Sequence, residues 1–166
     1  MWGKSTFYEE AVGISMIARL PGIIPSGSRS SVICNLMDLG PTFTDITNAD
    51  PLLHTDGHSL WSDLQGVSHT ARSNETFSEL HGDFKVVHSG DDRCVTREMD
   101  PPSRMVRKGP WKLIKYRGES PPILYNLDED PGELVDLGSD PNYIDVREML
   151  LKRVYDGWNP DYVHEQ

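Results

Sequence analysis

The feature that most constrains the fold is an unbroken apolar run near the start of the chain. Residues 11–18 read Ala-Val-Gly-Ile-Ser-Met-Ile-Ala, without a charged side chain. A short run that lacks polar alternation predicts a strand buried on both faces, which is typical of parallel sheets covered by helices. A Pro21-Gly22 turn and a turn-rich segment up to Ser31 follow it. The first part of the chain is therefore expected to belong to an α/β sheet.

Two short helices are expected after this strand. Asp38 is expected to cap a helix over residues 39–46. We interpret this aspartate as a helix cap rather than as a catalytic acid. Residues 59–64 form a second short helix that Gly66 would end. The Asp56-Gly57 pair predicts a tight turn between the two helices.

The second half of the chain changes to short alternating segments. A polar stretch over residues 67–74 predicts a boundary between two parts, 1–70 and 71–166. A final helix that begins at Asp140-Pro141 would cover the sheet that these segments form. The predicted strands are residues 76–80, 84–87, 103–107, 111–116 and 121–127, with a hairpin turn at 108–110. The second part should therefore be a small antiparallel sheet with a covering C-terminal helix.

The hairpin carries the main local concentration of basic residues. Strand alternation places Trp111, Leu113 and Lys115 on one face, and Lys112, Ile114 and Tyr116 on the other. The basic side chains are expected to form a solvated sheet face that balances an acidic chain, and the alternative is an anion-facing active-site rim or a subunit contact. This basic group is Arg104, Arg107, Lys108, Lys112 and Lys115.

Composition excludes some classes of function. The formal net charge of -10 argues against a nucleic-acid partner, because phosphate binding needs a basic surface. The sequence has no apolar run of the roughly 20 residues that would span a membrane, and shows no basic-then-apolar leader. Cys34 and Cys94 lie far apart and outside metal-ligand spacings, so free thiols in a reducing, cytoplasmic compartment are expected.

The histidines do not form a recognisable catalytic or metal motif. None has the i, i+4 spacing of a zinc helix, and adjacent His58 and Ser59 are not the usual arrangement of a base and a nucleophile. A metal cluster of His81, His88, Asp83 and Asp91 is conceivable, but surface turn residues are the expected interpretation. The sequence therefore predicts no catalytic residue and no metal ligand in this chain.

Five segments, in order, resemble motifs of type I sulfatases. These are the formylglycine-dependent, arylsulfatase-like and choline-sulfatase-like members of the alkaline phosphatase superfamily. The segments are Trp-Gly-Lys-Ser-Thr-Phe-Tyr-Glu-Glu at 2–10, Asp-Leu-Gly-Pro-Thr at 38–42, Asp-Gly-His-Ser-Leu at 56–60, Arg-Met-Val-Arg-Lys-Gly-Pro-Trp-Lys-Leu-Ile at 104–114 and Leu-Tyr-Asn-Leu-Asp-Glu-Asp-Pro-Gly-Glu-Leu at 124–134.

The resemblance implies the C-terminal portion of a sulfatase. Residues 1–70 would then be the end of the large α/β domain, and residues 71–166 the C-terminal subdomain. In that family the lysine at the position of Lys4 contacts the substrate sulfate, which makes Lys4 the candidate substrate-binding residue. The full-length enzymes also bind Ca²⁺ or another divalent ion. No such ion is expected to bind this chain alone.

The chain alone should not hydrolyse sulfate esters. Neither cysteine lies in the Cys-x-Pro-x-Arg motif that supplies the sulfatase nucleophile, since Asn35 follows Cys34 and Val95 follows Cys94. Two alternatives remain open. One is a fragment of a related phosphonate monoester or phosphodiester hydrolase. The other is a truncated, non-catalytic oligomerising or binding module, in which the exposed edge of the strand over 14–18 would promote a homo-oligomer.

Overall fold

A computed structural model describes residues 6–67, 74–80 and 102–159. The chain divides into two compact units, which are described separately. Unit 1 combines Met1–Gly13 with Phe77–Gln166, and unit 2 is Ile14–Thr76. The predicted boundary at residues 70/71, the predicted strand over 84–87 and Lys4 all lie outside the described residues.

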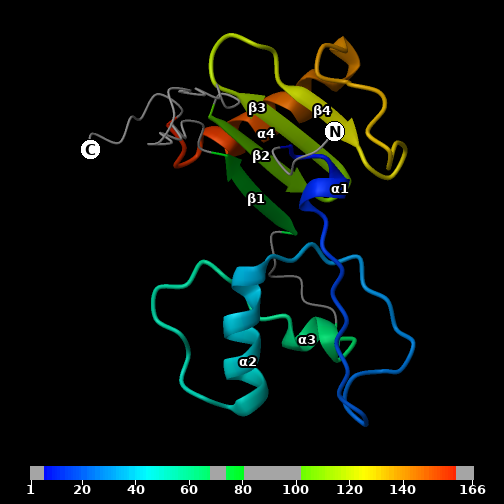
Figure 1. Ribbon diagram of the computed structural model, residues 1–166, viewed down its shortest axis with the longest axis vertical. Helices are drawn as coiled ribbons and strands as arrows, with labels where there is room; N and C mark the ends of the chain where they lie inside the picture. Colours follow the sequence, from blue (N-terminus) through cyan, green and yellow to red (C-terminus); the bar gives the residue numbers. More distant parts are fainter. Residues whose placement is uncertain (1–5, 68–73, 81–101, 160–166) are drawn as a thin grey trace, which may run out of the picture. The chain divides into compact units, whose positions relative to one another are not determined.

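Unit 1 is built on a four-stranded sheet with the strand order β1-β2-β3-β4 (Figure 1). Its strands are β1 (Glu75–Leu80), β2 (Ser103–Lys108), β3 (Trp111–Tyr116) and β4 (Ile123–Asn126). Strands β2 and β3 pair antiparallel, as do β3 and β4. The pair Lys108 and Trp111 closes the β2–β3 hairpin around a two-residue turn, where Gly109 has a φ of 56°. Such left-handed backbone favours glycine. The predicted antiparallel sheet is confirmed.

One helix covers one face of this sheet. A 3₁₀ turn over Pro141–Tyr143 leads into α4 (Ile144–Tyr155), and the Asp140 carboxylate accepts a hydrogen bond from the Asn142 backbone N–H at 2.9 Å. The predicted helix start at Asp140-Pro141 is thus confirmed. The core between α4 and the sheet consists of Val106, Leu113, Leu124, Leu150, Val154 and Trp158, all buried.

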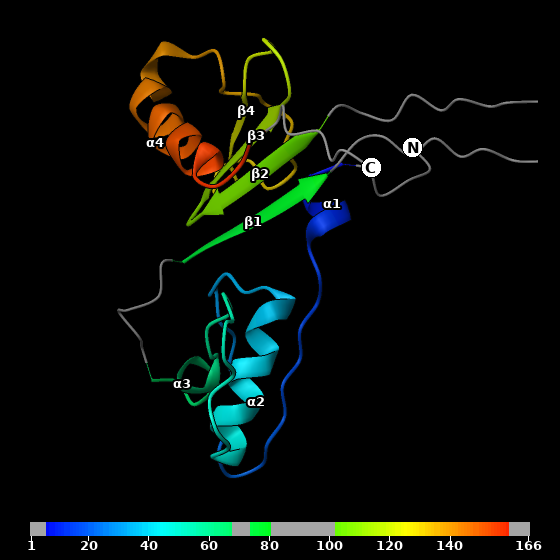
Figure 2. The same ribbon diagram turned by 90° about the vertical axis from the view of Figure 1, so that its left-hand side faces the viewer.

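The opposite face of the sheet receives the N-terminal segment. Figure 2 shows α4 on one side of the sheet and the short helix α1 (Glu9–Val12) on the other. Ile114 contributes to the core on the α1 side, whereas Leu113 belongs to the core on the α4 side. The alternation predicted for residues 111–116 is therefore correct.

Unit 2 contains a 3₁₀ turn (Leu36–Asp38), α2 (Leu39–Thr47) and α3 (Trp61–Leu64). The predicted helix after Asp38 is present, but the Asp38 carboxylate does not bond to α2. It accepts the backbone N–H groups of Asn35 and His58, both at 2.8 Å, and is buried. This carboxylate therefore ties together two loops that flank the helix. The predicted stop of α3 is confirmed by Gly66, whose φ is 76°.

The predicted strand over residues 11–18 is wrong. The first two of these residues end α1, and Gly13 to Leu20 have no regular secondary structure. Ile14, Met16 and Ile17 are exposed, Ile17 by 94%. A strand exists only when a neighbouring strand accepts its backbone hydrogen bonds, and no described segment of unit 2 pairs with this one. The segment is apolar, but the described residues do not form the sheet that an inner strand requires.

The tight turn predicted at Asp56-Gly57 is also wrong. The turn lies at Leu53-His54, and His54 takes the left-handed conformation with a φ of 57°. Gly57 serves a close approach instead, because a Cβ atom there would collide with the backbone carbonyl of Met37.

Candidate functional site

The segment Phe7–Glu9, which begins three positions after Lys4 in the sequence, is anchored on the sheet of unit 1. Lys4 itself lies outside the described residues, which begin at Thr6. Phe7 is only 1% exposed and belongs to a buried cluster on the sheet face opposite α4. The other buried members of this cluster are Met105, Ile114, Tyr125 and Leu127. Full burial of a phenylalanine stabilises the packed state by roughly 1.5–3 kcal/mol, so Phe7 fixes where this segment crosses the sheet.

Tyr8 adds a polar contact to this anchor. Its ring centroid lies 6.2 Å from that of Tyr125, with the rings tilted by 47°. Burial, a hydrogen bond with Tyr8 and the charges of Tyr8, Asp136 and Glu133 together raise the pKa of the Tyr125 hydroxyl well above its usual range. Tyr125 therefore stays protonated and paired with Tyr8 at neutral pH.

Glu9 joins a cluster of charges under α1. Its carboxylate accepts from Lys112 Nζ at 2.8 Å through Oε1, and from Arg107 Nη1 at 3.0 Å through Oε2. Lys112 Nζ also donates to Glu133 Oε1 at 2.8 Å. The Glu9 backbone N–H donates to Glu133 Oε2 at 2.6 Å. We call Glu9, Arg107, Lys112 and Glu133 the ion cluster. Two cations meet two carboxylates, so the cluster is balanced in formal charge.

The inner pair of the ion cluster is fully buried. The side chain of Lys112 is 0% exposed and that of Glu133 is 1% exposed, whereas Glu9 and Arg107 are 29% and 32% exposed. Charges buried to this degree are found paired, because leaving one alone is very unfavourable. The ion cluster therefore holds its geometry through the inner pair and reaches solvent at its outer pair.

Glu133 is presented to the cluster by an unusual turn. Its backbone takes a φ of 54°, which is uncommon for a residue other than glycine. The turn is stabilised by Asp130, whose carboxylate accepts the N–H groups of Leu134 and Val135 at 2.7 and 2.8 Å. Residues 130–133 therefore form a turn held by the side chain of its first residue. Its conformation directs the Glu133 carboxylate toward Lys112 and Glu9.

The expected solvated basic face on the hairpin is wrong. Lys112 is neutralised inside the ion cluster, and Lys115 is also buried. Lys115 Nζ donates to the carbonyls of Gly118 and Ser120, both at 2.7 Å, and burial lowers the pKa of this lysine. Arg104 binds two backbone carbonyls at the end of α4 and a carboxylate of β1. These side chains divide between both sheet faces and satisfy internal partners.

Sequence reasoning missed the ion cluster, although two signals pointed to it. Lys112 alternates onto the same face as the apolar Ile114, so it points toward a core rather than toward solvent. Glu133 lies in the segment 124–134, which resembles a sulfatase motif, directly after a Pro-Gly pair that is typical of a turn. No basic residue lies within four positions of Glu9 in the sequence, and only the fold brings Glu9 to β3.

The histidines supply no site within the described residues. No group of three or more His, Cys, Asp or Glu side chains in residues 6–67, 74–80 and 102–159 could hold a metal ion. The Ser59 hydroxyl accepts the Trp61 backbone N–H at 3.1 Å, directly before α3. The candidate metal residues His81, His88, Asp83 and Asp91 lie outside the described residues, as do Cys94, His69 and His164. No described helix has the length and apolar character that crossing a membrane requires.

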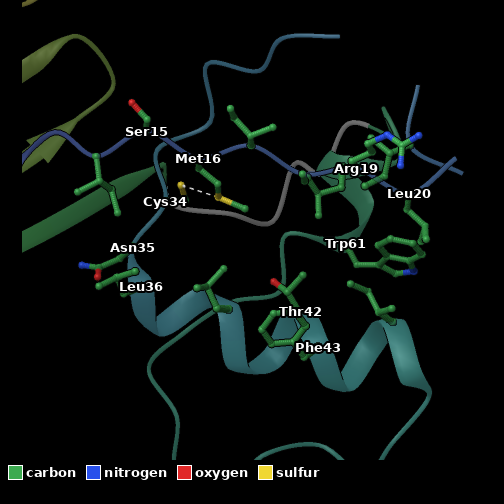
Figure 3. A pocket seen from close by; sticks show the side chains of 17 residues that line it. Ser15, Met16, Arg19, Leu20, Cys34, Asn35, Leu36, Thr42, Phe43 and Trp61 are labelled. Atoms are coloured by element: carbon green, nitrogen blue, oxygen red, sulfur yellow. Dashed lines mark hydrogen bonds between the residues drawn. The ribbon is translucent and has the colours of Figure 1, made fainter. Parts of the chain in front are cut away.

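Unit 2 carries a large apolar groove of about 510 Å³. The irregular segment Ile14–Leu20 forms one wall, and α2 and α3 form the other. Figure 3 shows Met16 on the first wall opposite Phe43 of α2, with Trp61 of α3 farther along. Cys34, a free thiol, lies at one end with its sulfur 3.9 Å from that of Met16. Unit 2 thus exposes a continuous apolar surface of the kind that marks a contact region.

Comparisons with known proteins agree on one family. The family model described as N-sulphoglucosamine sulphohydrolase, C-terminal, matches residues 1–158. The ulvan-active sulfatase of Formosa agariphila is 25% identical, over 92% of this chain and 34% of the relative. Two further curated sulfatases are matched over 28% and 27% of their own lengths. The chain therefore spans about a third or less of the curated relatives it matches.

Solved structures give the same fold. A 2-O GAG sulfatase is 28% identical with a TM-score of 0.55, over 70% of this chain and 23% of that one. The phosphonate monoester hydrolase of Agrobacterium radiobacter is 25% identical with a TM-score of 0.50, again over 70% and 23%. Both structures extend well beyond the part that this chain matches.

Proposed function

The chain belongs to the N-sulphoglucosamine sulphohydrolase C-terminal family of sulfatases, and from this premise we propose how it works. It acts as the C-terminal portion of a sulfatase-like sulfuric ester hydrolase. A catalytic portion supplies the nucleophile and the metal ligands. This chain completes the core of that portion and forms part of the wall of the substrate pocket. It also contributes Lys4, which contacts the substrate sulfate.

The observation that carries this proposal is the incomplete core of unit 2. Ile14, Met16 and Ile17 are exposed beside a groove that is lined mostly by apolar side chains. An apolar segment of this length has the composition of an inner strand of a parallel sheet, which is stable only when other strands flank it. Strands from the catalytic portion would provide those neighbours and cover the groove.

Lys4 would act by charge. Sulfuryl transfer gathers negative charge on the sulfuryl oxygens, and a lysine ammonium beside them stabilises that charge more strongly in a water-excluded site than in water. The anchored segment Phe7–Glu9 is consistent with this role, because it ties the chain beside Lys4 to the rigid sheet of unit 1. Lys4 would therefore recognise the sulfate group rather than the rest of the substrate.

A divalent ion belongs to the catalytic portion in this proposal. The described residues of the chain do not provide a set of ligands for it. No step assigned to this chain therefore runs through a metal.

A related alternative is a phosphonate monoester hydrolase, since such an enzyme shares the fold. The family model and the sulfatase relatives favour a sulfate ester as substrate. The two possibilities separate in a direct assay. The native polypeptide that carries this chain should hydrolyse 4-nitrophenyl sulfate at a higher kcat/KM than 4-nitrophenyl phenylphosphonate. The reverse order would favour the phosphonate alternative.

The mass of the native polypeptide separates an enzyme portion from a free-standing module. Mass spectrometry of the protein purified from its own gene should give a mass several times the 18.7 kDa of this chain, since the curated relatives are about three times longer. A native mass of 18.7 kDa, without a bound catalytic subunit, would contradict the proposal and favour a binding module.

A further inference from the structure

We propose that the sheet face of unit 1 opposite α4 is a peptide-binding site, and that residues 7–9 are its resident ligand (Figure 2). The ligand class is a short segment in which a carboxylate follows an aromatic side chain two positions later, a Phe-x-Glu segment. All residues of the site lie in unit 1 and in the described part of the chain, so the site does not depend on the proposed function.

The resident ligand is held by side chains and not as an added strand. Within the described residues, no backbone–backbone hydrogen bond joins residues 6–13 to the strands, and the N–H groups of residues 11–13 bond to the carbonyls of Tyr8 and Glu9. A peptide that adds a strand to a sheet is bound through its backbone, which any sequence offers, whereas pockets for side chains select a sequence. The binding of residues 7–9 is therefore sequence-specific.

The aromatic position of the ligand fills a pocket in the sheet. The Phe7 side chain is only 1% exposed. It packs in a cluster with Met105, Ile114 and Tyr125, one residue from each of the strands β2, β3 and β4. These three strands pair with one another, so the sheet fixes the walls of the pocket before the ring enters it. A preformed pocket binds its ligand without a further cost of ordering.

The carboxylate position of the ligand meets an excess of positive charge. Without Glu9, the ion cluster consists of Lys112, Arg107 and Glu133, and two cations then face one carboxylate. One positive charge is left without a partner, and the side chain of Lys112 is 0% exposed. An uncompensated charge at such depth is very unfavourable. A carboxylate from the ligand removes this cost, and a neutral side chain does not.

Glu133 sets the direction of the bound segment. Its Oε2 accepts the backbone N–H of Glu9 at 2.6 Å, while its Oε1 accepts from Lys112 Nζ at 2.8 Å. The Asp130 carboxylate holds this turn by accepting the two backbone N–H groups that follow Glu133. One ligand residue is thus bound through its carboxylate by Lys112 and through its backbone by Glu133. These two contacts allow a single orientation.

The ligand and the strands that bind it are far apart in the chain. Unit 2, which is Ile14–Thr76, lies between them in sequence, and Gly13 to Leu20 have no regular secondary structure. A short covalent connection therefore does not place residues 7–9 on the sheet, and the same contacts are open to an identical segment on a separate molecule. The chain itself adds only an effective concentration, which is about millimolar for flexible linkers.

The test uses the full 166-residue chain with its own ligand disabled, Phe7→Ala/Glu9→Gln, and a synthetic peptide of residues 6–13 with blocked ends. In isothermal titration calorimetry the peptide should bind this variant at least about tenfold more tightly than the unaltered chain, whose own segment competes. Equal binding to both chains would place the peptide elsewhere, such as the apolar groove of unit 2, and would overturn the proposal. So would no binding to the folded variant at about 1 mM peptide.

Two altered peptides test recognition of the carboxylate. Glu10 directly follows Glu9 but is exposed, so the peptides with Glu9→Gln and Glu10→Gln have the same composition and charge. The first change should weaken binding at least about tenfold, because it removes one partner of a buried, hydrogen-bonded charge pair. The second should have less than about a twofold effect. Equal losses would indicate attraction by overall charge alone and overturn the proposal.

Two altered chains locate the site. Arg107→Gln, added to the disabled chain, removes a donor to the ligand carboxylate and should weaken peptide binding at least about fivefold. Arg104→Gln removes the same charge from the same strand, but Arg104 donates to carbonyls at the end of α4, so it should have less than about a twofold effect. Equal effects of the two changes would overturn the proposal.

A milder variant covers the case in which Phe7→Ala/Glu9→Gln does not fold. Glu9→Gln alone keeps the apolar contacts of Phe7, and Glu9 is 29% exposed, so this change perturbs unit 1 less. The peptide should again bind this variant more tightly than the unaltered chain, with the same order of the two altered peptides. A reversed order would overturn the proposal.

Discussion

Replacing Lys112 with methionine should destabilise unit 1 far more than a typical substitution. The change leaves the Glu133 carboxylate, which is 1% exposed, without its buried counter-ion. Removal of one partner from a buried ion pair costs about 3–5 kcal/mol. For a unit of roughly 100 residues, 1 kcal/mol corresponds to about 4–8 °C in Tm, so Tm should fall by more than about 10 °C. Thermal unfolding followed by near-ultraviolet circular dichroism measures this loss.

A second variant isolates the reason for that loss. In Lys112→Met/Glu133→Met, no uncompensated charge remains in the interior, so at least half of the lost stability should return. Lys115→Met serves as the control, and it should cost no more than about 1.5 kcal/mol, since the two carbonyls that it frees lie on exposed chain and can bind water. A loss below 1 kcal/mol for Lys112→Met, or a double variant no more stable than the single one, would refute the reasoning.

Three further predictions follow from other contacts. The raised pKa of Tyr125 means that the folded state holds its proton more tightly, so stability should decline as the pH rises above the ordinary value of 10.0, and Tyr125→Phe should flatten this decline in pH-dependent urea unfolding. Gly138→Ala places a Cβ atom against the Pro122 carbonyl and should cost about 1–3 kcal/mol in the same assay, whereas Gly132→Ala, which meets only ordinary contacts, should be near neutral. Asp38→Ala leaves two backbone N–H groups without their acceptor and should cost about 2–4 kcal/mol, read as accelerated hydrogen exchange throughout unit 2.

Local sequence patterns were sufficient to predict the elements that depend only on neighbouring residues. The β2–β3 hairpin was predictable because strand alternation and a Gly-Pro turn lie within one short stretch. The start of the last helix followed from Asp140 and Pro141, whose capping roles depend on adjacent residues. The motif resemblance to sulfatases was confirmed by the family match over residues 1–158.

Patterns failed where the outcome depends on distant partners. The apolar run over residues 11–18 has the composition of an inner strand, but a strand forms only beside other strands, and composition does not tell whether they are present. The ion cluster joins Glu9 to Lys112 and Glu133, which lie 103 and 124 positions further along the chain. Single-sequence reasoning assigned Lys112 to solvent because most lysines are exposed. Its position between apolar neighbours of one sheet face was the better guide.

The most direct test of the account is hydrolysis of 4-nitrophenyl sulfate by two proteins, the 166-residue chain and the native polypeptide that carries it, each with and without added Ca²⁺. The account predicts no turnover by the folded 166-residue chain, and turnover by the native polypeptide that falls by at least about 10²-fold in Lys4→Ala. Turnover by the 166-residue chain alone would contradict the account, because it would place the nucleophile among residues to which no catalytic role is assigned.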